Sequence, residues 1–384
     1  MKIAIYGGAF NPVHNEHINI ALAAKEELGL DKVIVVPSNK SLHKLATLTV
    51  RAKDRLDMCR LAFEKYDGFE VSDCEIKRGG VTFSYVTCRR FKKLYPDAEL
   101  YFIMGADMLK SFADWKEPEE ILKCVTPAVC AREDSAELIK YIKNFSTRFK
   151  RDIVTFKYVG KNVSSTRIRT FAALGEDISD FVPQNVKNLI RSRNLYALPE
   201  IWGVKKLLTD ERWRHTVRVA LFAAKNASRA HVYEYDAILA SALHDCAKYL
   251  CESSPELNGF ECPKGVPAPV VHQYAGAYVA EYTFGITDKY VLNAIRYHTS
   301  GRENMGDLEK LIFLADLLEE GRDFDGVEAL RKIFYRDIDE CMLAALRSQL
   351  EYLEEQKKPV YSLTKRAYEY LSAIWLKEQK YDKS

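Results

Sequence analysis

The sequence lacks any long hydrophobic segment: no apolar run approaches the roughly 20 residues that a membrane-spanning helix needs. It also lacks a Cys-x-x-Cys pair, and its nine cysteines are scattered and odd in number. This spacing excludes a zinc ribbon and a disulfide framework and favours reduced thiols. The first residues are typical of a strand that enters a glycine turn, not of a signal peptide. We therefore expect a cytoplasmic protein with no membrane partner.

Length and charge suggest two different halves. A chain of 384 residues corresponds to about two average domains. Residues 1–198 carry 32 Lys and Arg against 25 Asp and Glu, whereas residues 199–384 carry 25 against 29. A basic half without long Lys or Arg runs fits anionic small molecules better than nucleic acid, although chance could produce the same imbalance. The oligomeric state stays open, a homo-oligomer included.

The first half alternates short β-rich runs with amphipathic helical patterns. Strands are expected at 2–6, 32–36, 69–76, 99–104, 125–130 and 153–159. Helices are expected between them, for example at 17–28, 51–66 and 84–95. This alternation predicts an α/β domain with a Rossmann-like, mainly parallel sheet, in which ligands bind beyond the carboxyl ends of the strands.

The second half contains helical patterns only. Apolar residues recur at three- and four-residue spacing in seven stretches, at 213–228, 234–250, 268–284, 289–298, 308–319, 326–356 and 362–379. We therefore expect an all-α domain. The boundary is placed near Leu198 and Pro199, which gives domains at 1–198 and 199–384.

A glycine-rich segment at 7–17 follows the first predicted strand. Gly7 and Gly8 allow a close approach of backbone to ligand, and the following helix offers free N–H groups to a phosphate. His14 and His17 are three residues apart, so both can face one anion and stabilise charge that grows on a polyphosphate. The alternative is a structural turn with two incidental histidines.

A second segment, Val163 to Arg169, follows the last predicted strand of the first half. Ser164, Ser165 and Thr166 are typical of a helix N-cap. The predicted helix carries Arg167 and Arg169 in its first turn, where cations oppose the helix dipole unless an anion compensates. A bound phosphate would explain this arrangement, and a capped surface helix with solvated arginines is the alternative.

These two segments resemble the paired signatures of the nucleotidyltransferase superfamily, and residues 1–198 are most similar to nicotinate-nucleotide adenylyltransferases. Further matches follow in family order: Pro37 with His43 and Lys44, Thr82 to Ser84 with Thr87, Met104 to Met108, Trp115, Val182 with Pro183, and Leu195 with Tyr196. Two positions depart, because Val86 stands where relatives often have aspartate and Glu16 stands where the family usually has glycine. We expect the Glu16 side chain to face away from the triphosphate, which it would otherwise repel.

The resemblance implies adenylyl transfer from ATP to nicotinate mononucleotide with Mg²⁺, which yields nicotinate adenine dinucleotide in NAD biosynthesis. It implies that His14, His17 and Arg169 are catalytic. The implied ATP-binding residues are Gly8, Phe10, His14, His17, Ser164, Ser165, Thr166 and Arg169. The implied nicotinate-nucleotide residues are Lys44, Thr82, Ser84, Asp107 and Trp115, of which Trp115 could equally be plain packing. Nicotinamide mononucleotide or phosphopantetheine is the alternative acceptor.

The second half gathers histidines and aspartates near helix ends. His215 lies at the start of one predicted helix, and His244 with Asp245 lies on the apolar helix predicted at 234–250. His272 begins a helix and His298 ends one, while Asp316 interrupts an apolar run. A carboxylate buried there must be paired or bound to metal. Each histidine alone could be an ordinary core residue, as we expect for His231, but the set suits a transition metal.

These residues resemble the HD phosphohydrolase superfamily, and most closely its symmetrical diadenosine tetraphosphatases, which form two ADP. The resemblance implies that His215, His244, Asp245 and Asp316 bind metal, with Asp245 and Lys248 catalytic. His272 and His298 would hold a second metal or the phosphate, and iron is the implied metal. The implied phosphate-binding residues are Arg212, Lys248, Thr299, Arg322 and Thr364. The alternative is a non-catalytic nucleotide-sensing module.

Overall fold

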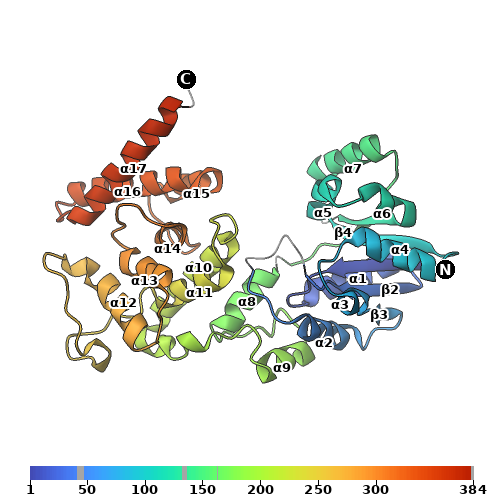
Figure 1. The fold of residues 1–384 in the computed structure, drawn as a ribbon, viewed down its shortest axis with the longest axis horizontal. Helices are drawn as coiled ribbons and strands as arrows, with labels where there is room; N and C mark the ends of the chain where they lie inside the picture. Colours follow the sequence, from blue (N-terminus) through green and yellow to red (C-terminus); the bar gives the residue numbers. More distant parts are fainter. Residues whose placement is uncertain (41–46, 132–135, 162, 382–384) are drawn as a thin grey trace. The chain divides into compact units, whose positions relative to one another are not determined.

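The computed structural model describes residues 1–40, 47–131, 136–161 and 163–381. Its backbone forms two compact units (Figure 1). The first unit comprises the described parts of 1–45, 49–169 and 177–196. The second comprises the described parts of 46–48, 170–176 and 197–384. The division at 196/197 lies close to the boundary expected at Leu198, but the segment 170–176 packs with the second unit.

The first unit is built on a parallel sheet of six strands in the order β3-β2-β1-β4-β5-β6. Every neighbouring pair is parallel, as in Ile5 opposite Ile34 and Ile3 opposite Leu100. The strands are β1 Lys2–Gly8, β2 Lys32–Pro37, β3 Phe69–Val71, β4 Glu99–Gly105, β5 Thr126–Ala131 and β6 Val154–Lys157. This order is that of a Rossmann-like sheet, so the predicted fold class of the first half is confirmed.

Helices cover the sheet because its strands are apolar on both faces. Ile5 and Phe102 pack into a core with Phe91 and Phe112. Ala4 and Val33, at strand positions that alternate with these and so face the other side of the sheet, are also buried. The helices are α1 Asn15–Glu27, α2 Ala52–Phe63, α3 Cys74–Arg78, α4 Ser84–Leu94, α5 Ala106–Ser111, α6 Pro118–Cys124, α7 Ala136–Phe149, α8 Ser165–Ala173 and α9 Gln184–Ser192. Strand order reverses between β1 and β4, so the loops after these two strands meet at one edge.

One predicted strand is shorter than expected. The run at 69–76 forms a strand only over Phe69–Val71, and Cys74–Arg78 is helical. The Ser72 hydroxyl accepts a hydrogen bond from the Cys74 N–H, which turns the chain out of the sheet. The apolar residues beyond Val71 therefore belong to helix α3 and not to the strand.

The second unit contains α-helices and short 3₁₀ turns and no strand in its described part. Its helices are α10 Asp210–Asn226, α11 Glu234–Leu243, α12 Val271–Tyr282, α13 Lys289–Tyr297, α14 Asp307–Leu318, α15 Val327–Arg336, α16 Ile338–Glu355 and α17 Ser362–Tyr381. The central helices α11 and α14 are buried almost all round, with Ile238, Leu243 and Leu314 fully inaccessible. The prediction of an all-α second domain is confirmed.

Two helical predictions in this unit are corrected by local hydrogen bonds. The stretch at 326–356 is two helices, because Asp337 is extended and its carboxylate caps α16 by accepting from the Glu340 N–H. The helix expected at 234–250 ends at Leu243, so His244 and Asp245 lie in the turns that follow it. There the chain tightens through bonds such as Lys248 N–H to the Asp245 carbonyl, 2.9 Å.

Two observations concern the helices and the cysteines of the described residues. No helix among them is both long and apolar enough to cross a membrane. All nine cysteines are free thiols, and most of them are buried.

Candidate functional site

The loop after β1 is held by three side chains from two other helices, α2 and α8. A guanidinium nitrogen of Arg55, on α2, donates to the Ala9 carbonyl at 2.6 Å, and Arg169 donates to the Asn11 carbonyl at 2.7 Å. The Ser165 hydroxyl donates to the Pro12 carbonyl at 3.2 Å. Three donors thus fix the backbone that joins the sheet to helix α1.

Aromatic packing closes the same loop. The Tyr196 hydroxyl donates to the Asn11 side chain at 2.9 Å. Phe10 has a positive φ of 45° and is only 2% exposed, and its ring lies against Gly8, where a Cβ would approach it to 3.1 Å. A side chain at position 8 would therefore press on the Phe10 ring, and Phe10 is too buried to offer a ligand much surface.

His14 and His17 stack face to face at the amino end of α1, with ring centroids 3.7 Å apart. The His14 N–H donates to Nδ1 of His17 at 3.2 Å, so the proton of His17 lies on Nε2. Burial lowers the pKa of His14 to about 3, which keeps it neutral at pH 7. Its Nδ1 is buried without a hydrogen-bond partner among the described residues. Two neutral imidazoles thus sit at the start of α1, where the N–H groups of Asn15 and His17 donate to the Phe181 and His14 carbonyls at 2.8 and 3.0 Å.

The serine-rich segment begins α8 as expected, with one correction. The Ser164 hydroxyl accepts from the Arg167 N–H at 3.2 Å, which is an N-cap bond. The helix starts at Ser165, so Arg169 lies in the second turn and not in the first. Arg169 is 4% exposed, and its guanidinium also donates to the Thr166 hydroxyl at 3.0 Å.

The residues expected on the acceptor side are partly brought to the same edge of the sheet. Asp107 follows β4 on α5, and its carboxylate folds back over Gly105. Trp115 packs on Phe102 and Phe112, with ring centroids 6.0 and 5.2 Å away, which favours its packing role. The Thr82 hydroxyl donates to the Lys40 carbonyl at 3.3 Å, and Ser84 begins α4. Lys44 lies outside the described residues.

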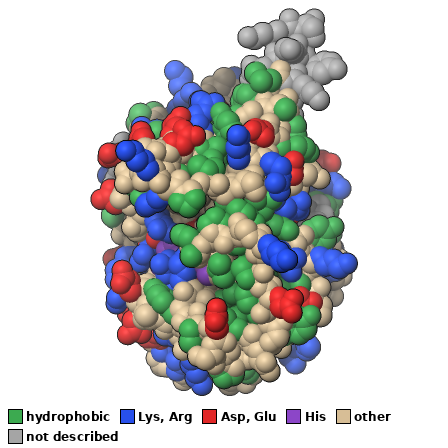
Figure 2. Space-filling model, turned by 90° about the vertical axis from the view of Figure 1, so that its left-hand side faces the viewer, with side chains coloured by type: hydrophobic (Ala, Val, Ile, Leu, Met, Phe, Trp, Pro, Cys, Tyr) green, Lys and Arg blue, Asp and Glu red, His purple; other side chains and the backbone are tan. Residues whose placement is uncertain are grey.

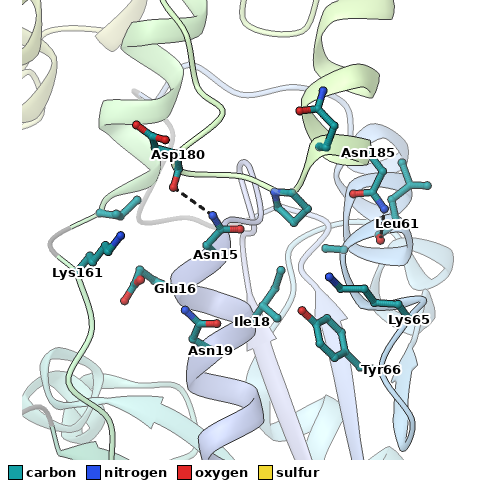
Figure 3. Close-up of a pocket in the computed structure, with 14 residues that line it drawn as sticks. Asn15, Glu16, Ile18, Asn19, Leu61, Lys65, Tyr66, Lys161, Asp180 and Asn185 are labelled. Atoms are coloured by element: carbon teal, nitrogen blue, oxygen red, sulfur yellow. Dashed lines mark hydrogen bonds between the residues drawn. The ribbon is translucent and has the colours of Figure 1, made fainter.

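A cavity of about 550 Å³ opens beside the amino end of α1 (Figure 3). Asn15, Glu16 and Asn19 line it from α1, opposite Lys65 and Tyr66. Glu16 is 6% exposed, and its carboxylate accepts a hydrogen bond from the Tyr158 hydroxyl at 3.0 Å. His14 and His17 do not line this cavity, so Glu16 faces a different space from the two histidines, as expected from its charge.

In the second unit, six predicted side chains converge from five segments. The potential ligand atoms form two groups, and within each group they lie within 4.8 Å of one another. The first group is His215, His244 and Asp316, and the second is His244, Asp245 and His298. His272 is adjacent, with Nε2 3.2 Å from Nε2 of His298 and 3.3 Å from the Asp245 carboxylate. Thr299 contacts the same His272 nitrogen at 3.1 Å.

The three histidines of these groups share one orientation. Nδ1 of His215 lies 3.0 Å from the Glu319 carboxylate, and Nδ1 of His244 lies 2.6 Å from the Ser241 carbonyl. Nδ1 of His298 lies 2.8 Å from the Ile295 carbonyl. These oxygens only accept, so each Nδ1 donates, and in the neutral form of each ring Nε2 keeps its lone pair for the centre of the group.

Several atoms at the centre of the group receive no hydrogen bond, and a bound cation could take the place of the missing donors. Nε2 of His215, Nε2 of His244 and Oδ1 of Asp245 are buried and make no hydrogen bond. Neutral imidazole nitrogens with carboxylate oxygens form a ligand set typical of transition metals. The residues present therefore fit a metal ion, and the same residues are those that the sequence indicated.

Cations surround this centre. Arg212 donates to Asp245 at 3.1 Å, and Arg322 pairs with the Asp316 carboxylate and donates to the Asp316 carbonyl at 2.8 Å. Lys248 lies 3.0 Å from Nε2 of His272. Figure 2 shows histidine side chains recessed at the surface beside Lys and Arg side chains. Thr364, by contrast, is 3% exposed on α17 and makes no hydrogen bond with the histidines or aspartates of this site.

The pKa shifts reflect this pairing. Burial raises the pKa of Asp316, but bonds and charges from His215, His244 and Arg322 more than offset it and hold the pKa well below its usual range. Burial likewise raises the pKa of Glu319, but His215 and Arg218 lower it to about 2. Burial and the neighbouring cationic groups lower the pKa of His272 to about 3. The carboxylates are therefore charged and His272 is neutral at pH 7.

Comparison with known proteins assigns each unit. Residues 5–171 match the cytidylyltransferase-like family and residues 212–321 match the HD domain family. The chain is 31% identical over 329 residues to a Mycoplasma genitalium protein named probable nicotinate-nucleotide adenylyltransferase/Ap4A hydrolase, which covers 84% of this chain and 88% of that relative. The chain belongs to this adenylyltransferase family, in a form that carries an HD domain.

Two further proteins each match one half. A probable nicotinate-nucleotide adenylyltransferase of Clostridium tetani is 38% identical over 197 residues, which are 51% of this chain and 98% of that relative. A solved structure of a predicted HD superfamily hydrolase involved in NAD metabolism, from Clostridium acetobutylicum, is 29% identical with a TM-score of 0.40. It covers 45% of this chain and 98% of that one.

Three residues of the sites had no role predicted from the sequence. Arg55 is 4% exposed and supports the β1 loop of the adenylyltransferase unit, and Glu319 contacts a histidine of the HD unit. Gln273 is fully buried and accepts from the N–H groups of Thr299 and Ser300. A charged or amide side chain on the apolar face of a predicted helix is the signal that could have found them, because such a group must have a partner.

Proposed function

We propose that the first unit transfers the adenylyl group of ATP to nicotinate mononucleotide. The observation that carries this proposal is the pair of stacked, neutral histidines at a helix start, on a loop clamped by Arg55 and Arg169, in a chain of the adenylyltransferase family. The acceptor phosphate forms a bond with the α-phosphorus of ATP, and the bond to the β-phosphate breaks and releases pyrophosphate. Nicotinate adenine dinucleotide is the second product.

No protein base is needed for this step. A phosphate monoester has a second pKa near 6, so the acceptor is already mostly ionised at pH 7. Catalysis then depends on position and on donors for the charge that grows on the phosphates. His17 supplies its Nε2 proton as one such donor. Mg²⁺, which would offset the negative charge of the phosphates, is part of the proposal.

For the HD unit we propose symmetrical hydrolysis of diadenosine tetraphosphate into two ADP. Water forms a bond with one of the two central phosphorus atoms, the central P–O–P link breaks, and a proton is released. His215, His244, Asp245 and Asp316 would hold a transition metal, with iron as our proposal, while His272 and His298 would hold a second ion or the phosphate. Such an ion, when bound, lowers the pKa of water and stabilises charge on phosphate oxygens.

The surrounding cations suit this polyphosphate substrate. Arg212 and Arg322 are paired with Asp245 and Asp316, and a cation bound to these carboxylates would free both guanidinium groups for substrate phosphates. Lys248 stands beside neutral His272, where it can meet a phosphate oxygen. The bound substrate would then replace the carboxylates as the partner of these cations.

Both activities are tested on the full chain. The first assay supplies ATP, Mg²⁺ and nicotinate mononucleotide and separates the dinucleotide product by chromatography. The second supplies diadenosine tetraphosphate with Fe²⁺, Mn²⁺ or Co²⁺ and separates ADP from AMP plus ATP. Formation of the dinucleotide and of ADP alone supports the proposal. Absence of dinucleotide contradicts the first half, and AMP plus ATP or no cleavage contradicts the second.

A further inference from the structure

Glu319 is a buried carboxylate that neither proposed ligand set contains. It follows the last residue of α14 and is 1% exposed. We propose that Glu319 is a positioning residue of the HD unit, which holds His215 with Nε2 directed at the metal. The inference rests on the metal site in the proposed function and adds a residue that acts through His215.

His215 differs from His244 and His298 in the group that contacts its Nδ1. Backbone carbonyls hold His244 and His298, whereas a carboxylate holds His215 at 3.0 Å. A carboxylate partner keeps the proton of His215 on Nδ1 and makes the imidazole a better electron donor at Nε2. That nitrogen is 3.0 Å from the Asp316 carboxylate and has no hydrogen bond of its own.

Both oxygens of Glu319 are occupied by donors, so the residue itself is not free to become a ligand. One oxygen faces Nδ1 of His215, and the other accepts from Nε of Arg218 at 2.6 Å and from the Gly321 N–H. These donors compensate the buried charge, which would otherwise be costly. The carboxylate is therefore held as a fixed acceptor on the outer side of His215.

Gly321 is required for this arrangement. A Cβ at position 321 would lie 2.5 Å from Nε of Arg218, so any larger residue would displace the guanidinium from Glu319. His215, Arg218 and Gly321 thus come from α10 and from the turn after α14 to meet one carboxylate. Such an arrangement fixes where α10 presents His215.

Glu309, in the first turn of α14, offers a matched control for Glu319. It is 4% exposed and pairs with Arg302 through bonds of 2.7 and 2.6 Å, so it too is a buried Glu–Arg pair. It makes no contact with the histidines or aspartates of the site among the described residues. Glu309→Gln therefore removes a comparable buried charge without touching His215.

The test measures the Kd of the full metal-free chain for Co²⁺ from its visible absorption spectrum. Loss of an outer partner of a ligating histidine typically weakens metal binding by about 10–100-fold. We expect a loss of about this size in Glu319→Gln and a Kd near that of the wild type in Glu309→Gln. Glu319→Asp keeps the carboxylate and should lie between Glu319→Gln and the wild type. Nitrogen-15 NMR of the metal-free wild type should show the His215 proton on Nδ1.

An equal Kd in Glu319→Gln and Glu309→Gln would overturn the inference, as would equal losses in Glu319→Gln and Glu319→Asp. If circular dichroism shows that Glu319→Gln does not fold, Arg218→Met carries the test with the same criterion against Glu309→Gln. The readout is independent of the reaction. A wild-type chain that binds Co²⁺ but leaves diadenosine tetraphosphate intact contradicts the proposed function and not the role of Glu319.

Discussion

The two units use histidine in opposite tautomers, and the partner of Nδ1 makes the difference. In the adenylyltransferase unit a backbone N–H donates to Nδ1 of His17, which leaves a proton on Nε2. In the HD unit a carbonyl or carboxylate accepts from Nδ1 of His215, His244 and His298, which leaves a lone pair on Nε2. The first arrangement suits phosphate oxygens and the second suits a cation.

The supports of the two sites differ as well. Donors from Arg55, Arg169 and Ser165 hold the backbone of the β1 loop, so the first site is formed without any ligand. The second site contains buried nitrogen and oxygen atoms without partners among the described residues, and its arginines pair with Asp245 and Asp316. The comparison teaches that protein donors alone fix the backbone of the first site, whereas our proposed function assigns a cation to the second.

The largest expected effect separates the two sites. Asp245→Ala removes an inward-facing carboxylate that is 2% exposed, so we expect loss of bound metal and a fall in hydrolysis of about 10³-fold or more, equivalent to several kcal/mol. Adenylyl transfer by the same chain should not change. Elemental analysis and both assays measure this. Full metal occupancy with continued release of ADP would place the metal site elsewhere.

His17→Ala should have the opposite effect, because it should lower adenylyl transfer and leave hydrolysis unchanged. It removes the Nε2 donor, and kcat for adenylyl transfer should fall by about 10²–10³-fold, the scale for losing one preorganised donor. Hydrolysis by the HD unit serves as the internal control and should stay constant. Turnover close to that of the wild type would show that His17 does not meet the phosphates.

The pH dependence of stability should follow the burial of His14. Its pKa is lowered to about 3 in the folded chain, from 6.5 when unfolded, so the unfolded state binds the proton first. The contribution of His14 to stability is therefore complete above pH 6.5 and declines as pH falls from 6.5 toward 3. Between pH 6.5 and 5 the loss is about 2 kcal/mol.

Denaturant unfolding of wild type and His14→Gln at both pH values measures this difference. The glutamine variant should lose less stability over the same interval, because it cannot take up the proton. Identical pH dependence in the two proteins would show that His14 is not buried as a neutral imidazole.

The smallest expected effect concerns the acceptor. Nicotinate mononucleotide should be preferred over nicotinamide mononucleotide by at least about tenfold in kcat/KM, because N–H donors that read a carboxylate contribute about 1.5–3 kcal/mol. Competition between the two acceptors in one reaction measures the preference. Equal use of both would show that the site does not read the carboxylate, and it would leave the tautomers of both sites untouched.

Much of both sites could be predicted from sequence because their residues stand in local patterns. The alternation of strands and helices predicted the parallel sheet, and the glycines before His14 marked its carboxyl edge. The charges in the apolar helices of the second half predicted that these side chains converge, and ligand atoms of His215, His244 and Asp316 lie within 4.8 Å of one another. Strand length at 69–76 and helix length at 234–250 were wrong, because Ser72 and His244 end these elements through hydrogen bonds of their side chains.

By itself, the sequence determined which residue types stand at each strand end and helix end, and therefore the fold class and the candidate ligands. Only the tertiary structure decided which nitrogen of each histidine faces the site. That choice depends on partners distant in the chain, such as Glu319 for His215, 104 positions away, and on loop supports such as Arg55. Periodicity carries no information on such pairs, because a hydrogen bond between distant segments forms only after the helices have packed.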